Sequence, residues 1–172
     1  MHEQKTCPRP IIPQLTAIGV IHTAYRQAKG TPVQGVLGGG EQGVVEIYPE
    51  YAEGLLDVAG FERLWLVTLL DRASAPQLIA KPYLDTQTHG VFATRAPARP
   101  NPIGLSVVRL LSVEGNRLMV ADVDMLDGTP LLDLKPYVPA FDSFEASRTG
   151  WYQGRSAQGA VADDRFEFHT NL

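Results

Sequence analysis

Hydrophobic residues along this chain fall in short runs whose length and alternation are typical of β-strands. The run at residues 64–70 (LWLVTLL) is apolar on both faces, which predicts a central, buried strand. Residues 113–122 turn at Gly115-Asn116 and therefore predict a β-hairpin. Runs rich in β-branched or apolar residues predict further strands at 16–23, 44–48, 90–94, 105–111 and 131–134. The pattern gives about seven strands.

One stretch carries a helical pattern. It begins at Pro49, a favourable residue for the first helical position, and continues to Gly60. Its apolar face comprises Tyr51, Leu55, Leu56 and Val58. With about seven strands and one or two helices, we expect a mainly β fold, a single-sheet mixed β-barrel, and not a doubly wound α/β sheet.

Three segments organise the chain. Residues 1–14 are proline-rich and predict a flexible N-terminal lead-in, residues 15–142 form the predicted barrel domain, and the more polar residues 143–172 form a C-terminal extension. Within the barrel domain, residues 26–43 hold six glycines and few apolar residues. They predict a long mobile loop of a kind that is often functional.

Composition limits the classes of function. The net charge is −4, with 19 acidic against 15 basic residues, which argues against a broad electrostatic contact with nucleic acid. No apolar run approaches the ~18 residues of a membrane span, and the polar N-terminus does not resemble a secretory signal. The single cysteine, Cys7, cannot form an internal disulfide, which fits a reducing compartment. We therefore expect a cytoplasmic protein with no membrane segment.

Metal and covalent catalysis find little support in the motifs. His2, His22, His89, His169 and Cys7 show no spacing typical of metal ligands. No G-x-S-x-G nucleophile motif is present either. We expect neither a bound metal nor a covalent intermediate.

Two glycine-containing motifs lie in the long loop. The triplet at 38–40 (GGG) lacks the ending of a phosphate-binding loop and the frame of a dinucleotide site, so a hinge is the better interpretation. At residues 32–35 (PVQG), Gln34 either offers its amide to a ligand or faces solvent. The sequence leaves both interpretations open.

A rigid, arginine-containing turn follows the predicted strand at 90–94. Residues 95–102 (RAPARPNP) hold three prolines, which fix the backbone and preorganise the side chains. Arg95 stands where the apolar run ends, so its guanidinium is expected over the barrel mouth, where it would pair with a carboxylate or phosphate. The alternative is a structural ion pair with a nearby acid. No role is assigned to Arg99.

Acidic residues gather after the predicted hairpin. Asp122 and Asp124 alternate, which predicts that both lie on the same side of a strand. Together with Asp127 and Asp133 they are four acids in twelve residues, expected to converge with Arg95 at strand ends as a place for a cation, although Asp127 also fits a simple turn. Asp133, Lys135 and Tyr137 also alternate, so one of them is a candidate for proton transfer.

These motifs together resemble a known family. Residues 90–106 (GVFATRAPARPNPIGLS), 124–130 (DMLDGTP) and 133–137 (DLKPY) closely resemble the TrmO-like family, also called YaeB- or TsaA-like. The likeness also includes residues 18–22, 32–35 and 61–65, reaches Trp151, and covers about three-quarters of the chain. Members of the family are S-adenosylmethionine-dependent methyltransferases that N6-methylate threonylcarbamoyladenosine beside the anticodon of tRNA.

The resemblance implies a homodimeric β-barrel with the cofactor near the dimer interface. The cofactor contacts that it implies are Pro32, Val33, Gln34, Leu70, Asp71, Arg95, Leu105, Asp122, Val123, Asp124 and Met125. At position 71 the family often has His, and an Asp there would meet the cofactor's ribose hydroxyls or amino group. Longer members carry an extra C-terminal domain thought to help bind tRNA, so for this chain we expect few phosphate contacts and salt-sensitive binding.

Three hypotheses follow from the resemblance. The first is a tRNA methyltransferase, with Asp133, Lys135 or Tyr137 assisting proton removal from the acceptor. The second is a barrel that binds S-adenosylmethionine without catalysis. The third is a methyltransferase that acts on a small molecule or another RNA.

Overall fold

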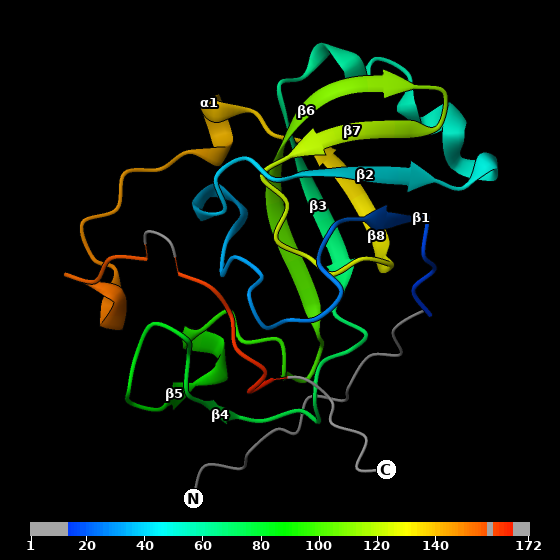
Figure 1. The fold of residues 1–172 in the computed structure, drawn as a ribbon. Helices are drawn as coiled ribbons and strands as arrows, with labels where there is room; N and C mark the ends of the chain where they lie inside the picture. The colour runs from blue at the N-terminus through cyan, green and yellow to red at the C-terminus, as the bar shows by residue number, and fades with distance from the viewer. Residues whose placement is uncertain (1–13, 158–159, 167–172) are drawn as a thin grey trace, which may run out of the picture.

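Six strands close into one β-barrel (Figure 1). The computed structural model describes residues 14–157 and 160–166. The barrel strands are β1 (Gly19–His22), β2 (Gln42–Ile47), β3 (Arg63–Leu69), β6 (Ile103–Glu114), β7 (Arg117–Ala121) and β8 (Thr129–Pro136). Around the barrel their order is β1-β2-β7-β6-β3-β8, and every neighbouring pair is antiparallel.

The prediction of a mainly β barrel is confirmed, with corrections of detail. The sheet is antiparallel and not mixed, because each strand pairs with a neighbour of opposite direction. Strand β6 spans both the run at 105–111 and the start of the hairpin, and residues 90–94 contribute no barrel strand, so the barrel has six strands and not about seven. The predicted hairpin turn is correct, since Glu114 pairs with Arg117 across Gly115-Asn116.

The predicted strand at 90–94 is wrong. His89–Gly90 (β5) pairs with Ile79–Ala80 (β4) in a separate two-stranded sheet, and Val91–Ala93 (η4) then forms a 3-10 turn. The carbonyl of Val91 accepts hydrogen bonds from the amide of Thr94 at 3.0 Å and from its hydroxyl at 2.9 Å. This side-chain bond to the local backbone competes with strand pairing.

The predicted helix at 49–60 divides into two 3-10 helices, Pro49–Leu55 (η2) and Val58–Gly60 (η3). Between them Asp57 adopts a left-handed backbone conformation with φ of 65°, which a continuous helix does not allow. The remaining helical turns are η1 (Gly35–Leu37), α1 (Pro139–Asp142) and η5 (Gly150–Tyr152). No helix in the described part of the chain is long and apolar enough to cross a membrane.

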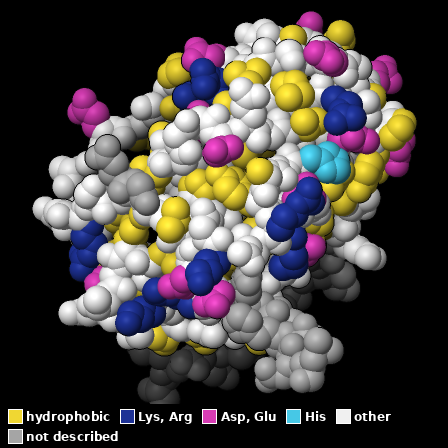
Figure 2. Space-filling model, viewed as in Figure 1, with side chains coloured by type: hydrophobic (Ala, Val, Ile, Leu, Met, Phe, Trp, Pro, Cys, Tyr) yellow, Lys and Arg dark blue, Asp and Glu magenta, His cyan; other side chains and the backbone are white. Residues whose placement is uncertain are grey.

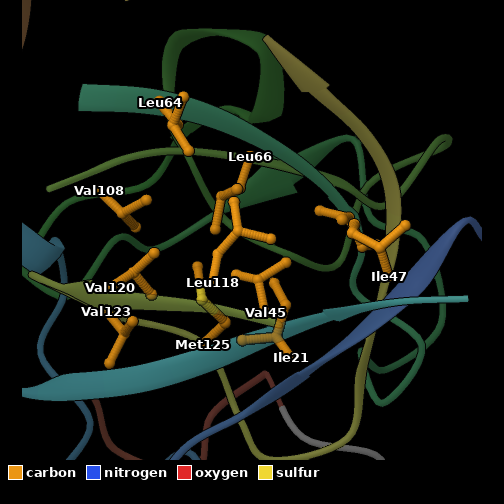
Figure 3. Close-up of a cluster of buried hydrophobic side chains, with 11 residues drawn as sticks. Ile21, Val45, Ile47, Leu64, Leu66, Val108, Leu118, Val120, Val123 and Met125 are labelled. Carbon is orange, nitrogen blue, oxygen red and sulfur yellow. The ribbon is translucent and has the colours of Figure 1, made fainter. Parts of the chain in front are cut away.

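Buried aliphatic side chains fill the barrel (Figure 3). Leu64 and Leu66 of β3 point inward and are fully buried, while Trp65 and Val67 on the opposite face are half-buried. Burying one such leucine contributes about 1.5–3 kcal/mol to folding. The run at 64–70 is therefore an alternating strand with a partly covered outer face.

A second apolar cluster includes Ala80 of β4 and Val91 directly after β5. These two strands lie outside the barrel (Figure 1). Ala96 and Ala98 of the proline-rich turn are buried there against Phe166. The ring of Phe166 meets that of Tyr83 edge-on, with centroids 5.3 Å apart. The cluster thereby holds the turn that carries Arg95 at one end of the barrel.

Candidate functional site

A cavity of about 830 Å³ opens at one end of the barrel and continues onto its outer surface. Its walls come from the loop at residues 31–36, the end of β3, the proline-rich turn, the start of β6, residues 124–126 and the late residues Ala162 and Phe166. A volume of this order is typical of a small-molecule site. Segments far apart in sequence therefore form one wall.

The carboxylate of Asp124 lies recessed in this wall. Its two oxygens accept hydrogen bonds from the hydroxyl of Ser106 at 2.7 Å and the backbone amide of Gly35 at 2.9 Å. Burial raises the pKa of Asp124, while these two bonds and the nearby charge of Arg95 lower it. The site thus holds a fixed carboxyl group whose pKa is above its ordinary value.

Gly35 is required for the loop to lie against Asp122. A Cβ at position 35 would come within 1.8 Å of the Asp122 carbonyl oxygen, which no side chain tolerates. Asp122 itself has a left-handed backbone, with φ of 67°, and its carboxylate pairs with Nη1 of Arg63 at 3.1 Å. This turn directs Asp122 toward Arg63, whereas Asp124 faces the loop.

Arg95 is exposed at the cavity and donates a hydrogen bond to the side-chain oxygen of Gln34. The bond joins the proline-rich turn to the loop at residues 31–36. Arg99 also lines the cavity, and its Nη1 lies 3.4 Å from the carbonyl oxygen of Thr94. Two guanidinium groups therefore border the same opening.

The end of β3 supplies a third guanidinium. Arg72 donates through Nη2 to the Asp127 carbonyl at 2.8 Å and to the Thr129 hydroxyl at 3.2 Å. Its Nε lies 3.6 Å from a carboxylate oxygen of Asp71 but is buried without a hydrogen-bond acceptor among the described residues. Because an unsatisfied buried donor is costly, this atom is suited to a ligand's acceptor.

The turn at residues 150–155 holds the arginine-bearing segment from outside the barrel. Trp151 donates its indole N–H to the Ala93 carbonyl at 2.7 Å and stacks on His89 with centroids 4.9 Å apart. The carboxylate of Asp85, 5% exposed, pairs with His89 at 2.9 Å and with Arg155 at 2.8 Å. The bond with His89 is the main cause that lowers the pKa of Asp85 to about 2.

The cavity includes most of the cofactor residues that the sequence suggested. Those that line it are Pro32, Val33, Gln34, Leu70, Asp71, Arg95, Leu105, Asp124 and Met125. Asp122 and Val123 do not: Asp122 pairs with Arg63, and Val123 is fully buried in the barrel core. The prediction that Asp122 and Asp124 share one side of a strand is wrong, because β7 ends at Ala121.

The three proton-transfer candidates are separated. Tyr137 lines the cavity and packs against Trp65, with ring centroids 5.8 Å apart. Asp133 and Lys135 are absent from the lining and pair with each other at 2.6 Å on the surface. Their alternation along β8 is real, but the chain leaves the strand after Pro136, and Tyr137 follows a different course.

Sequence reasoning missed several lining residues. Ser106 and Arg72 contact site groups directly, and Trp65 and Phe166 line the cavity. The motif of residues 90–106 includes Ser106, but nothing in it indicates a partner eighteen positions away. Within residues 14–157 and 160–166, no three His, Cys, Asp or Glu side chains gather as a metal site would require.

The barrel and its polar-edged, largely apolar cavity define a small-molecule-binding β-barrel protein. The model of the tRNA-methyltransferase O N-terminal domain matches residues 20–143. The chain belongs to this TrmO family.

Relatives and solved structures agree with that assignment. A probable S-adenosyl-L-methionine-binding protein of Pyrococcus abyssi is 49% identical over 147 residues, which cover 86% of this chain and 76% of that protein. The mouse tRNA (adenine(37)-N6)-methyltransferase is 34% identical over 135 residues, 73% of this chain and 31% of that protein. The crystal structure of TrmO from Pseudomonas aeruginosa matches with a TM-score of 0.69 and 36% identity, over 82% of this chain and 63% of that one.

Proposed function

We propose that this protein binds S-adenosylmethionine in the cavity and transfers its methyl group to a nitrogen of a tRNA base. The observation that carries the proposal is the recessed carboxylate of Asp124 beside Arg95, in a cavity with apolar walls. The Pyrococcus abyssi relative is named for binding this compound, and the mouse relative is named for methylating tRNA.

The residues present fit the charges of such a ligand. Asp124 and Asp71 offer negative charge to a sulfonium and an ammonium group, and Arg95 and the buried Nε of Arg72 offer donors to a carboxylate. The apolar surface suited to an adenine ring comes from Pro32, Val33, Leu70 and Leu105. The lining thus offers a suitable partner for each chemical group of the proposed cofactor: its two positive groups, its carboxylate and its adenine ring.

In methyl transfer the main task of the protein is to align the methyl donor with the acceptor. When bound, S-adenosylmethionine supplies an electrophilic methyl group on a sulfonium sulfur. The chain's part is to orient the acceptor and to exclude water, which the recessed cavity favours. Tyr137 is the member of the proton-transfer trio that lines the cavity, so its hydroxyl is the candidate to hydrogen-bond the acceptor or accept its proton.

We propose threonylcarbamoyladenosine in threonine-type tRNA as the acceptor. The proposal is supported by the family resemblance of residues 90–106 and by the N6 position in the name of the mouse relative. A ureido nitrogen is a weak nucleophile, which explains why a polar group such as Tyr137 would be held near the acceptor.

Incubation with methyl-labelled cofactor and total tRNA tests the function. Label in threonylcarbamoyladenosine supports the whole proposal. Label in another nucleoside supports methyl transfer to RNA but overturns the assignment of threonylcarbamoyladenosine as the acceptor. Tight cofactor binding without label in any RNA overturns RNA methylation and leaves a non-catalytic binding barrel or a methyltransferase of small molecules.

The cofactor site has its own test. Arg95→Ala should abolish cofactor binding measured by calorimetry, because a ligand carboxylate would lose a charged donor at the cavity. Arg117→Ala, a half-exposed arginine on β7, is the control and should bind normally. Unchanged affinity in Arg95→Ala would exclude the role of this arginine.

We further propose that the protein is a homodimer through the outer face of β6. Ile103, Leu105 and Leu111 are exposed there at 41, 55 and 42%, and the first two also line the cavity. Apolar exposure along one strand is typical of a protein interface. Sedimentation should give a dimer for the wild-type protein and a monomer for Leu111→Glu; a wild-type monomer at micromolar concentration would refute the proposal.

A further inference from the structure

A second groove adjoins the proposed methyl-donor cavity. It has a volume of about 470 Å³ and is lined by Lys81, Tyr83, Leu84, Asp85, Thr86, Arg155 and Arg165. Tyr83 also lines the first cavity, so the two spaces meet at its side chain. In Figure 2, Lys and Arg side chains gather on this part of the surface, over β4, β5 and the late segment of the chain, with Asp and Glu side chains among them. This groove, which we call the basic groove, was not expected from the sequence.

The acidic groups at the basic groove are already neutralised. Asp85 is 5% exposed and pairs with both His89 and Arg155. Arg165 covers the ring of Tyr83, with its guanidinium carbon 5.1 Å from the ring centroid, and pairs with Asp163 at 2.5 Å. Lys81 is exposed and pairs with no carboxylate in the described part of the chain. Three cations (Lys81, Arg155 and Arg165) thus stand against two carboxylates (Asp85 and Asp163), and Lys81 is the cation that leaves the groove with a positive charge.

The two arginines are held rigidly, which favours recognition of an anion. Arg165 donates to the carbonyl of Pro82 at 3.1 Å, and Arg155 donates to the carbonyl of Trp151. Most N–H groups of Arg165 are taken up by Asp163 and by the carbonyls of Lys81 and Pro82, whereas Arg155 uses one bond each to Asp85 and Trp151 and presents its remaining N–H groups in a fixed geometry. Both come from residues after 143, beyond the match to the family domain.

From this arrangement we infer that the basic groove binds backbone phosphates of the RNA whose base enters the neighbouring cavity. The inference rests on the proposed function, since it assigns the path of that same substrate. Phosphate oxygens are the acceptors that clustered Lys and Arg side chains recognise, and contact through Tyr83 places the groove beside the cavity. RNA would thus contact a local basic site on a protein whose net charge is −4.

Lys81→Glu and Lys81→Gln provide the test, because Lys81 is exposed and its loss leaves the core intact. Anisotropy of a fluorescein-labelled anticodon stem-loop RNA should show roughly three- to ten-fold weaker binding to Lys81→Glu at low salt. The slope of log affinity against log salt should fall by about 0.7–1, as expected when one phosphate contact is lost. Affinity for S-adenosylmethionine, measured by calorimetry, should not change.

Arg117→Glu is the matched control, because this half-exposed cation lies at the far end of the β6–β7 hairpin from the basic groove (Figure 1). It should bind the RNA like the wild-type protein. Equal RNA affinity and salt slope in Lys81→Glu and the wild-type protein would overturn the inference, even if the wild-type protein methylates tRNA. If the wild-type protein methylates no tRNA but its RNA binding still depends on Lys81, the proposed function is refuted and the inference about the groove stands.

Inorganic phosphate distinguishes an RNA path from a small-anion site. Phosphate should compete with the RNA for the wild-type protein more than for Lys81→Gln. If phosphate binds through Lys81 but leaves RNA affinity unchanged, the groove is a small-anion site and the inference is wrong.

Discussion

At the scale of single residues, Asp124 has a tightly constrained environment in the site. Ser106 and the amide of Gly35 occupy its two oxygens, and the surrounding protein raises its pKa. A recessed carboxylate held by two donors cannot turn away from the cavity. Its charge is therefore available at a fixed place, provided that the pH stays above the raised pKa.

The pH dependence of cofactor binding should report this carboxylate. As pH falls from neutral through the raised pKa of Asp124, the group gains a proton and loses its attraction for a sulfonium or ammonium group. We expect wild-type affinity to fall over a range above the ordinary titration of Asp. Asp124→Asn should bind roughly ten-fold more weakly at neutral pH, with a flatter profile.

Calorimetry between pH 5 and 8, in both proteins, checks this prediction. Asp133→Asn serves as the control and should keep the wild-type profile, because Asp133 is outside the cavity lining and pairs with Lys135 at the surface. If Asp124→Asn kept the full wild-type pH profile, another group would be responsible.

Gly35 is a second residue on which the site depends, because the position has no room for a Cβ atom. Gly35→Ala places a Cβ at 1.8 Å from a backbone oxygen, so the loop must move away from Asp122 and lose its bond to Asp124. We expect a cost of about 1–3 kcal/mol in the free energy of unfolding and weaker cofactor binding. Gly54→Ala is the control, since no atom lies within 4 Å of a Cβ there. Equal urea midpoints for the two variants would contradict the prediction.

At the scale of elements, short segments outside the barrel position its site. The turn η5 lies against η4 through the bond from Trp151 to Ala93, two residues before Arg95. Asp85 completes the contact, because it pairs with both His89 and Arg155 beside the stacked His89 and Trp151 rings. The conformation of the arginine-bearing turn therefore depends on residues more than fifty positions later.

Trp151→Phe tests this dependence. Phenylalanine retains an aromatic surface for His89 but removes the N–H that holds the Ala93 carbonyl. We expect a few-fold weaker binding of the cofactor, of the order of one lost hydrogen bond, and a slightly lower melting temperature. Tyr152→Phe, at an exposed neighbour, should leave both unchanged. Normal cofactor affinity in Trp151→Phe would show that the turn does not need this bond.

At the scale of the whole molecule, the closed barrel is the source of stability. Each of its six strands pairs on both sides, so no edge is left open within the sheet. Buried side chains from all the strands meet inside it (Figure 3). Most of the cavity lies at the end and on the outer face of this barrel, and Met125 belongs to both the core and the cavity lining.

Leu66→Ala should therefore destabilise the protein by about 2–5 kcal/mol, because it leaves a void in a fully buried position. Leu56→Ala, at a position 79% exposed, should change stability by at most about 0.5 kcal/mol. Urea unfolding followed by circular dichroism measures both. Similar urea midpoints for the two variants would mean that burial of Leu66 does not contribute this much to the free energy of unfolding.

Local pattern alone determined much of the barrel. The alternation in β3, the turn at Gly115-Asn116 and the strand character of residues 44–48 depend on near neighbours, and the structure has strands and a hairpin there. The prolines after Arg95 likewise identified a rigid turn, which borders the cavity. These features follow from side-chain alternation and fixed backbone angles, which act within a few residues.

Tertiary structure decided which of the candidate residues meet. Asp122 and Asp124 diverge because of one left-handed residue, and Asp133 and Lys135 pair at the surface while Tyr137 reaches the cavity. The site is closed by Ser106, Phe166 and other residues from distant segments. No local pattern encodes these contacts, because closure of the barrel and packing of the late segment set their distances, and both depend on the whole chain at once.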